Sequence, residues 1–362
     1  MNASLLAPLL FLAGDLTVIA LLLHFMPTWT RSDIVFSVTV DPTFRTTETG
    51  RRIVQRYRIW LWIHTAAALA IAVAALRSQR PALFPVGVLY QIGGGFAAFL
   101  GARRRTLPHA VPTTTLRSAE LAPRTDRFPG GLPAQFGPFA LLGGAAAVLA
   151  ARWSAIPERF PVHWNIEFQP DRWVMRSPQA VFGPLAVGVL VCCAVGVMAY
   201  AAFRLIPRTR LQPPLAAGEA RYRRAVAIVL LASEYVVAAA FAWGALMPLR
   251  AELRSPGWVI IGGPLLGLAV VVLAVVGLVR ARRASSGTSP ETFAGGSAPA
   301  GDRTPDSCWK AGVFYFNPAD PAIFLEKRFG LGYTLNFANL WSWVIMAAVL
   351  LVPLVASFLL LR

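Results

Sequence analysis

The sequence has few charged side chains and few groups suited to catalysis or metal binding. Charged residues make up 14% of the 362 residues, whereas soluble domains carry about 25%. There are only four histidines and three cysteines. Cys192, Cys193 and Cys308 form neither a disulfide framework nor a CxxC metal pattern. No Ser-His-Asp, HExxH or paired-carboxylate arrangement stands at a plausible membrane depth. We therefore expect neither an enzyme nor a bound metal or cofactor.

Long apolar runs are abundant instead. Hydrophobic residues form 56% of the chain, and a bilayer span needs about 20 mostly apolar residues. Eight stretches qualify, at residues 4–26, 58–76, 82–101, 136–152, 179–203, 225–248, 257–279 and 339–361. The sequence therefore predicts an all-α integral membrane protein, an eight-helix transmembrane bundle whose main partner is the lipid bilayer.

The positive charge follows the predicted loops. The net charge is +17, and the arginines gather in alternate loops, which the positive-inside rule assigns to the cytoplasm. This places the N-terminus and the C-terminus outside the cytoplasm, in a cell (inner) membrane. The basic face is expected to meet anionic lipid headgroups, so nucleic acid is a poor second interpretation of the charge.

The predicted spans divide the chain into six segments. Residues 1–135 hold three helices with cytoplasmic loops, residues 136–203 a helix-loop-helix unit, and residues 204–280 two further helices. Residues 281–307, rich in Ser, Gly, Ala and Pro, are predicted to be a flexible cytoplasmic linker. Residues 308–343 form a small aromatic, β-like cytoplasmic motif, and residues 339–361 the last helix. The strand-like residues 34–40 are candidates to pair with the strand-like start of the cytoplasmic motif.

The largest extracytoplasmic loop carries the best candidate binding surface. Its candidate residues are His163, Trp164, Asn165, Asp171, Arg172 and Trp173. In an extended segment His163 and Asn165 share one face, and Pro170 with Asp171 predicts a turn. Such a loop suits a peptide or a lipid headgroup, although one histidine cannot hold a metal alone. The alternative is that Asp171 and Arg172 brace the loop while the tryptophans sit at the membrane interface.

Asp15 and Glu234 are the carboxylates deep inside predicted spans. Ionisable groups at that depth are candidate functional sites that should face the bundle interior. Together with His64 they would suit a proton or cation path. The alternative is that each is protonated and hydrogen-bonded to a neighbouring helix.

The cytoplasmic motif holds a third set of candidates: Asn317, Asp320, Lys327, Arg328, Gly330, Gly332 and Asn336. Its Gly-x-Gly lacks the spacing and the strand–helix context of a phosphate-binding loop. We expect Lys327 and Arg328 to touch lipid phosphates and the glycines to permit a tight turn. A second basic run, Arg103-Arg104-Arg105, is expected to anchor its helix at the membrane edge.

Two motifs resemble those of uncharacterised bacterial membrane proteins. One is Ile156-Pro157, Phe160-Pro161-Val162-His163-Trp164-Asn165 and Gln169-Pro170-Asp171-Arg172-Trp173, which resembles the extracytoplasmic loop of SdpI-type immunity proteins. Phe168 stands where that loop usually has glycine. The other is Tyr315-Phe316-Asn317-Pro318, Asp320-Pro321, Lys327-Arg328-Phe329-Gly330-Leu331-Gly332 and Thr334-Leu335-Asn336-Phe337, similar to a C-terminal motif of larger members of the same group. The resemblance implies immunity to, and signalling of, a secreted peptide toxin through a partner repressor.

These observations favour a sensor or immunity-type membrane protein that meets an extracellular peptide or envelope component, with a possible cytoplasmic regulator as partner. The alternative is a secondary transporter that uses the intramembrane carboxylates. A membrane enzyme acting on lipid comes third, because a catalytic constellation is missing.

Overall fold

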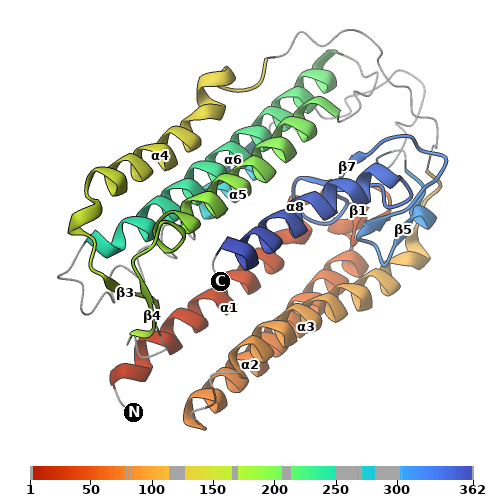
Figure 1. Ribbon diagram of the computed structural model, residues 1–362. Coiled ribbons are helices and arrows are strands. Elements are labelled where there is room, and N and C mark those ends of the chain that lie inside the picture. Colours follow the sequence, from red (N-terminus) through yellow and green to blue (C-terminus); the bar gives the residue numbers. More distant parts are fainter. Residues whose placement is uncertain are drawn as a thin grey trace. The chain divides into compact units, whose positions relative to one another are not determined.

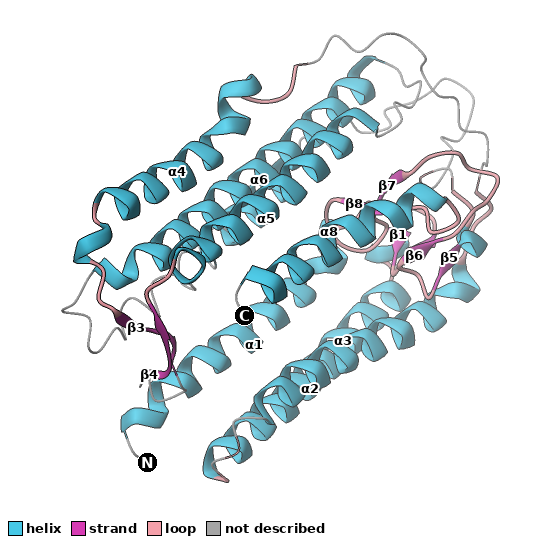
Figure 2. Ribbon diagram, viewed as in Figure 1, coloured by secondary structure: helices cyan, strands magenta, loops and turns pink. Residues whose placement is uncertain are grey.

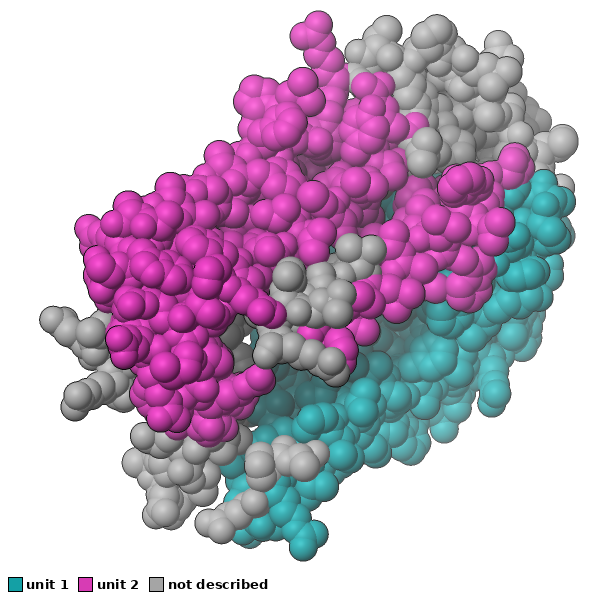
Figure 3. All heavy atoms as spheres, in the orientation of Figure 1, with its two compact units in different colours: residues 1–118, 289–320, 325–338 teal, residues 119–288, 321–324, 339–362 magenta. Residues whose placement is uncertain are grey.

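The structure, a computed structural model, describes residues 3–78, 80, 83–113, 127–164, 170–205, 213–249, 267, 271–281, 302 and 304–360. The chain forms two compact units, shown in Figure 3. The first comprises residues 1–118, 289–320 and 325–338, and the second residues 119–288, 321–324 and 339–362. Sequence from both ends of the chain therefore contributes to the first unit.

Three helices form the body of the first unit (Figure 1): α1 (Ala3–Trp29), α2 (Glu48–Arg77) and α3 (Phe84–Thr106). Thr47 caps α2, since its side chain accepts a hydrogen bond from the Gly50 amide at 3.1 Å. Fully buried Gln91 on α3 donates to the Leu16 carbonyl of α1 at 2.7 Å. This bond ties α3 to α1 in the apolar interior, where an unpaired amide would be costly.

Short hairpins gather in the first unit (Figure 2), to which all their residues except Phe324 belong. They are β1 (Ile34–Val35) with β2 (Val38–Thr39), β5 (Trp309–Lys310) with β6 (Phe314–Tyr315), and β7 (Phe324–Glu326) with β8 (Tyr333–Leu335). One-turn 3₁₀ helices flank them at η1 (Phe44–Thr46), η3 (Leu107–His109) and η6 (Asp306–Cys308). The prediction that residues 34–40 pair with the C-terminal motif was wrong. Each of the two segments forms its own hairpin instead. Positive φ angles reverse the chain direction within a tight turn, at Phe36 and Ser37 in one hairpin and at Ala311 and Gly312 in the other.

An aromatic cluster joins these hairpins to the helices. Phe36 of the first hairpin stacks edge-on against Tyr57 of α2, with ring centroids 5.0 Å apart. Phe329 contacts Phe99 of α3 at 4.4 Å. Phe36, Tyr57 and Phe99 are almost completely buried. We refer to the two hairpins β1–β2 and β5–β6, with residue 302 and residues 304–308, 316–320 and 325–338, as the cap.

The second unit holds α4 (Gly131–Ala151), α5 (Pro178–Leu205), α6 (Pro213–Leu246) and α8 (Leu340–Leu360). Helices α4 and α5 both pack on α6, and α8 packs on α5. Between α4 and α5 lie η4 (Trp153–Ala155) and one hairpin, β3 (Arg159–Trp164) with β4 (Pro170–Met175). A further 3₁₀ turn, η5 (Met247–Leu249), follows α6.

The described helices support the membrane class. Six of them are long and apolar enough to cross a bilayer, and two shorter apolar helical stretches lie at Val271–Ala281 and Leu340–Leu351. Helices stand at seven of the eight predicted spans, whereas most of the predicted span at residues 257–279 lies outside the described residues. The chain is thus a mostly helical membrane protein, and the total of eight spans stays a prediction.

Candidate functional site

The loop predicted to bind a ligand is an antiparallel hairpin. Its register pairs Arg159 with Met175, Pro161 with Trp173 and His163 with Arg172, with irregularities on either side of His163. The turn predicted at Pro170 and Asp171 was wrong, because β4 begins at Pro170. Proline lacks an N–H donor but fits the first residue of a strand.

The base of the hairpin is fixed to its helices. Arg176 donates from Nη1 to the carbonyls of Trp153 at 3.0 Å and Ile156 at 2.7 Å, and its guanidinium lies 5.7 Å from the centre of the Trp153 ring. Buried Phe160 belongs to the same apolar cluster as Leu149 and Val181. These contacts hold the start of β3 rigidly on the second unit.

The outer part of the hairpin is polar, aromatic and open to solvent. His163 Nδ1 and Asp171 Oδ1 are 2.5 Å apart, and 64% and 43% of these side chains are exposed. Arg159 lies over the Trp173 ring at 5.7 Å, and Trp173 is 45% exposed. The structure therefore brings His163 together with Asp171, while Arg172 is an exposed residue in register with His163. The Trp164 side chain and Asn165 lie outside the described residues.

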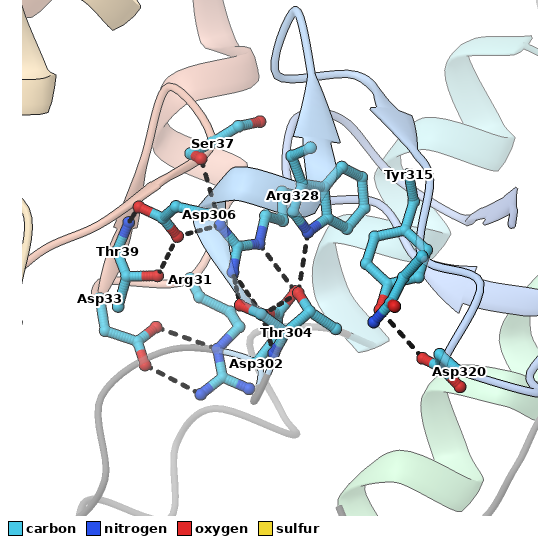
Figure 4. A network of polar contacts seen from close by, with 12 residues as sticks. Arg31, Asp33, Ser37, Thr39, Asp302, Thr304, Asp306, Tyr315, Asp320 and Arg328 are labelled. Carbon is cyan, nitrogen blue, oxygen red and sulfur yellow. Dashed lines mark hydrogen bonds and ion pairs between the residues drawn. The ribbon is translucent and has the colours of Figure 1, made fainter. Parts of the chain in front are cut away.

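A second polar cluster lies in the cap and centres on Arg328 (Figure 4). Its Nε and Nη2 donate to the Asp302 carboxylate at 3.0 and 2.8 Å, and its Nη1 donates to the Ser37 carbonyl at 3.2 Å. Further bonds reach the Asp306 carboxylate and the Thr304 carbonyl. All five guanidinium N–H groups are thus used. The guanidinium also lies 5.3 Å from the centre of the Trp309 ring.

Asp306 joins the two distant parts of the cap. Its carboxylate accepts from the Thr39 backbone amide at 3.0 Å and from the Thr39 hydroxyl at 2.8 Å. Arg103 of α3 donates to the carbonyls of Phe36 and Ser37. Two arginines therefore balance two aspartates in a mostly buried network that spans the N-terminal hairpin, α3 and the C-terminal motif.

This arrangement corrects two expectations. The Arg328 side chain is completely buried, so it does not reach lipid phosphates, because the two carboxylates hold it inside the cap. Arg103 is also buried and bonds to backbone rather than anchoring at the membrane edge. Lys327 is exposed, so contact between Lys327 and lipid phosphates stays a prediction.

Asp302 shows how strongly the network favours ionised side chains. Burial pushes its pKa upward, but the positive charge of Arg328 and the bonds from Arg328 and Thr304 hold the pKa below its ordinary value. Thr304 donates to Asp302 at 2.6 Å from its hydroxyl. Asp302 and Thr304 fall in the segment predicted to be linker up to residue 307, so folded structure begins earlier than predicted.

Asn336 braces the C-terminal motif. Its amide nitrogen donates to the carbonyls of Asn317 at 2.9 Å and Asp320 at 2.8 Å, and its oxygen accepts from the amides of Asn317 and Ala338. Both donors and both acceptor positions of the side chain are therefore filled. Asp320 in turn accepts a hydrogen bond from the Tyr315 hydroxyl at 3.0 Å. Asn317, Asp320 and Asn336 therefore stabilise the loop to which they belong.

Gly330 and Gly332 have φ angles of 102° and 90°, conformations that residues with a Cβ rarely adopt. The Lys327 amide donates to the Gly332 carbonyl at 3.1 Å across this turn. The turn predicted from the Gly-x-Gly pattern is confirmed.

The intramembrane candidates lie on different elements. Asp15 is on α1 of the first unit, and Glu234 is on α6 of the second. His64 of α2 pairs with the Tyr90 hydroxyl of α3, with 3.3 Å between Nδ1 and the oxygen. Glu234 is 1% exposed, and neither carboxyl oxygen has a hydrogen-bond partner among the described residues. A Cβ added to Gly196 of α5 would lie 3.3 Å from both oxygens.

Sequence reasoning missed most of the Arg328 network. The predicted linker at residues 281–307 includes Asp302, Thr304 and Asp306, because the sequence around them is rich in Ser, Gly, Ala and Pro. A usable signal was present, however. Two acids and an aromatic segment follow a stretch with few charges, and acids in a predominantly basic chain need basic partners.

Two family models match parts of the chain. A domain of unknown function, DUF1648, matches residues 140–189, which hold the β3–β4 hairpin with parts of α4 and α5. A family of unknown function, DUF5808, matches residues 318–343, within the C-terminal motif and the start of α8. No curated protein and no solved structure matches the chain. Together with the apolar helices, these matches indicate a membrane protein that carries two conserved-domain segments whose functions are unknown.

Proposed function

We propose that this protein is a bacterial inner-membrane sensor or immunity protein whose β3–β4 hairpin meets an extracellular peptide. The observation that carries the proposal is the exposed His163–Asp171 pair beside Trp173, on a hairpin whose base Arg176 holds rigidly. A rigid base with an exposed polar and aromatic face limits the entropy lost on binding.

A peptide fits this surface better than a small solute. The sheet has two strands among the described residues, so each strand has an edge that can accept an added strand. Trp173 and exposed Val162 supply apolar contacts, while Asp171 and Arg159 supply charges of both signs. An extended amphipathic peptide can use all of these groups at once.

The cap suits the opposite side of the membrane. It lies at the chain segments that the positive-inside rule assigns to the cytoplasm, and the hydrogen-bonding groups of its Arg328 and Asn336 side chains all have partners within the cap. Phe314 and Phe316 are 51% and 45% exposed. We propose that the cap stabilises the first unit and offers these rings to a cytoplasmic regulator. The protein is proposed to act without enzymatic chemistry.

The test compares cells that lack the gene with cells complemented by the wild type, by Trp173→Ala, and by the matched control Glu158→Gln. Survival is measured against a panel of secreted amphipathic peptide toxins of both net charges, with the amount of each variant in the membrane checked by blotting. We expect deletion and Trp173→Ala to lower survival about tenfold, as expected for losing an aromatic anchor, and Glu158→Gln to have little effect. Unchanged toxin sensitivity, envelope-stress tolerance and reporter expression in the deletion strain would refute the proposal.

A secondary transporter is the second candidate, because Glu234 is buried without a described partner. An ionisable side chain inside a membrane span is a candidate for a proton or cation path. In proteoliposomes, Glu234→Gln or Asp15→Asn should abolish flux driven by a pH gradient, while Glu158→Gln should not. Absence of flux for every solute tested with the wild type would eliminate this candidate.

A further inference from the structure

A groove runs between α1 and α2 of the first unit. Its volume is about 580 Å³, and it is lined by His24, Gln55, Arg58, Ile59, Trp62 and Ile63. The α2 members are three or four residues apart, so they share one face of the helix. Gln55 and Arg58 lie at one end of this face. Ile59 and Ile63 follow them along the helix, toward the middle of the predicted span at residues 58–76.

Most of the surface that lines the groove is apolar, and its few hydrogen-bond donors belong to side chains at one end. Trp62 Nε1 lies 3.2 Å from His24 Nδ1, and an indole nitrogen can only donate. His24 Nδ1 is therefore the acceptor, and the neutral ring carries its proton on Nε2. Arg58 donates from Nε to the His24 carbonyl at 3.3 Å, while its two Nη groups have no partner among the described residues. The donors left over carry a net positive charge and have no acceptor within the part of the chain that the structure describes.

The other end of the groove is apolar and exposed. Ile59 is 53% and Ile63 is 49% exposed. One helical turn separates them, which amounts to about 6 Å along the helix axis. Arg58 stands at the first residue of the predicted span and His24 near the end of the preceding one, so both lie at the depth where headgroups meet hydrocarbon.

We propose that this groove binds one anionic phospholipid, whose phosphate meets Arg58 and His24 and whose acyl chain lies along Ile59 and Ile63. Charge complementarity selects the occupant. A guanidinium whose two Nη groups meet no acceptor among the described residues matches the oxygens of a phosphate. The adjoining apolar face matches an acyl chain, which inorganic phosphate lacks. A zwitterionic lipid would bring a choline cation close to Arg58.

The experiment titrates the purified full-length protein, in a neutral detergent, with dioctanoyl phosphatidylglycerol and counts bound lipids by native mass spectrometry. We expect one tight site in the wild type. Arg58→Gln should weaken it about tenfold, which is the effect of one charge-assisted pair. The matched control Arg56→Gln removes an exposed arginine of the same helix that does not line the groove, and it should change the affinity less than about twofold.

Two further arms separate the sources of phosphate. Dioctanoyl phosphatidylcholine should bind at least about tenfold more weakly, and millimolar inorganic phosphate should not displace the lipid. Arg58→Lys keeps the charge and serves as a folding control, with partial retention of binding expected. Equal losses in Arg58→Gln and Arg56→Gln, equal binding of the two lipids, or displacement by inorganic phosphate would each overturn the proposal.

Discussion

Arg328 shows what is needed to stabilise a buried charge in a protein that has few charged residues. Desolvating a guanidinium costs several kcal/mol, and only good geometry to opposite charges offsets that cost. Asp302 and Asp306 provide the opposite charges, and the Ser37 and Thr304 carbonyls take up the remaining donors. Removing one member would leave the other charges buried without compensation.

Arg328→Met should therefore lower the free energy of unfolding by about 3–5 kcal/mol, the range for breaking a buried ion pair from one side. Thermal unfolding of the purified protein in detergent measures the loss as a lower midpoint. The matched control is Lys327→Met, at the exposed neighbouring position, which should cost less than about 0.5 kcal/mol. Similar midpoints for the two variants would mean that the Arg328 network contributes little to stability.

The lowered pKa of Asp302 predicts a dependence of stability on pH. A carboxyl whose folded pKa lies below its unfolded value of about 3.9 stabilises the fold fully above that value. The contribution is lost as pH falls from there through the folded pKa. Wild-type stability should drop when pH is lowered below about 4, and Asp302→Asn should be less stable at neutral pH and show a smaller drop. Parallel pH profiles for the two proteins would contradict this.

At the scale of elements, the turn of the β5–β6 hairpin fits closely against α3. Gly312 has a φ angle of 76°, and a Cβ there would lie 2.8 Å from Arg103 Cδ and 2.9 Å from Phe99 Cζ. Gly332 has a φ angle of 90° but open space around the corresponding position. Substitutions at the two glycines therefore distinguish two effects. A Cβ at Gly332 introduces backbone strain alone, whereas a Cβ at Gly312 adds a steric clash.

Gly332→Ala should destabilise the protein by about 1–2 kcal/mol, the cost of a left-handed conformation with a Cβ. Gly312→Ala should cost more, because its methyl group also displaces the Arg103 side chain and the Phe99 ring. Unfolding of both variants in the same detergent gives the comparison. If Gly312→Ala is no less stable than Gly332→Ala, the packing of this turn on α3 contributes nothing.

The helices were predictable from sequence and the cap was not. Apolar runs report lipid exposure directly, so α1 to α6 and α8 appear where the runs predict them. Most ends differ by a few residues, but α2 begins at residue 48 rather than 58 and α6 at residue 213 rather than 225, because both helices continue beyond their apolar runs. His163 and Asp171 could also be predicted as members of the extracytoplasmic loop. Their contact could not, because it depends on the strand register, and Pro170 suggested a turn where the second strand begins. The bond between Asp306 and Thr39 could not be predicted, because its partners are 267 residues apart and composition carries no information about such contacts.

At the scale of the whole molecule, the distribution of arginine predicts which ends of the helices face the cytoplasm. The test places a cysteine at exposed Val162 in a Cys192→Ser, Cys193→Ser background and keeps the native Cys308 of the cap. A membrane-impermeant maleimide applied to intact cells should label Val162→Cys and leave Cys308 unlabelled, because the hairpin is predicted outside and the cap inside. Permeabilised, denatured cells supply the control in which both thiols react. Labelling of Cys308 in intact cells would reverse the proposed orientation.

The contact between Thr39 and Asp306 also constrains how the chain is made. A ribosome adding about 5–20 residues per second needs on the order of ten seconds or more to progress from one partner to the other. During that interval the Thr39 amide and the Thr39 hydroxyl lack the Asp306 carboxylate that accepts their hydrogen bonds in the folded protein. The first three helices therefore enter the bilayer before the segment that stabilises them has been translated, and the cap closes as a late step of biogenesis.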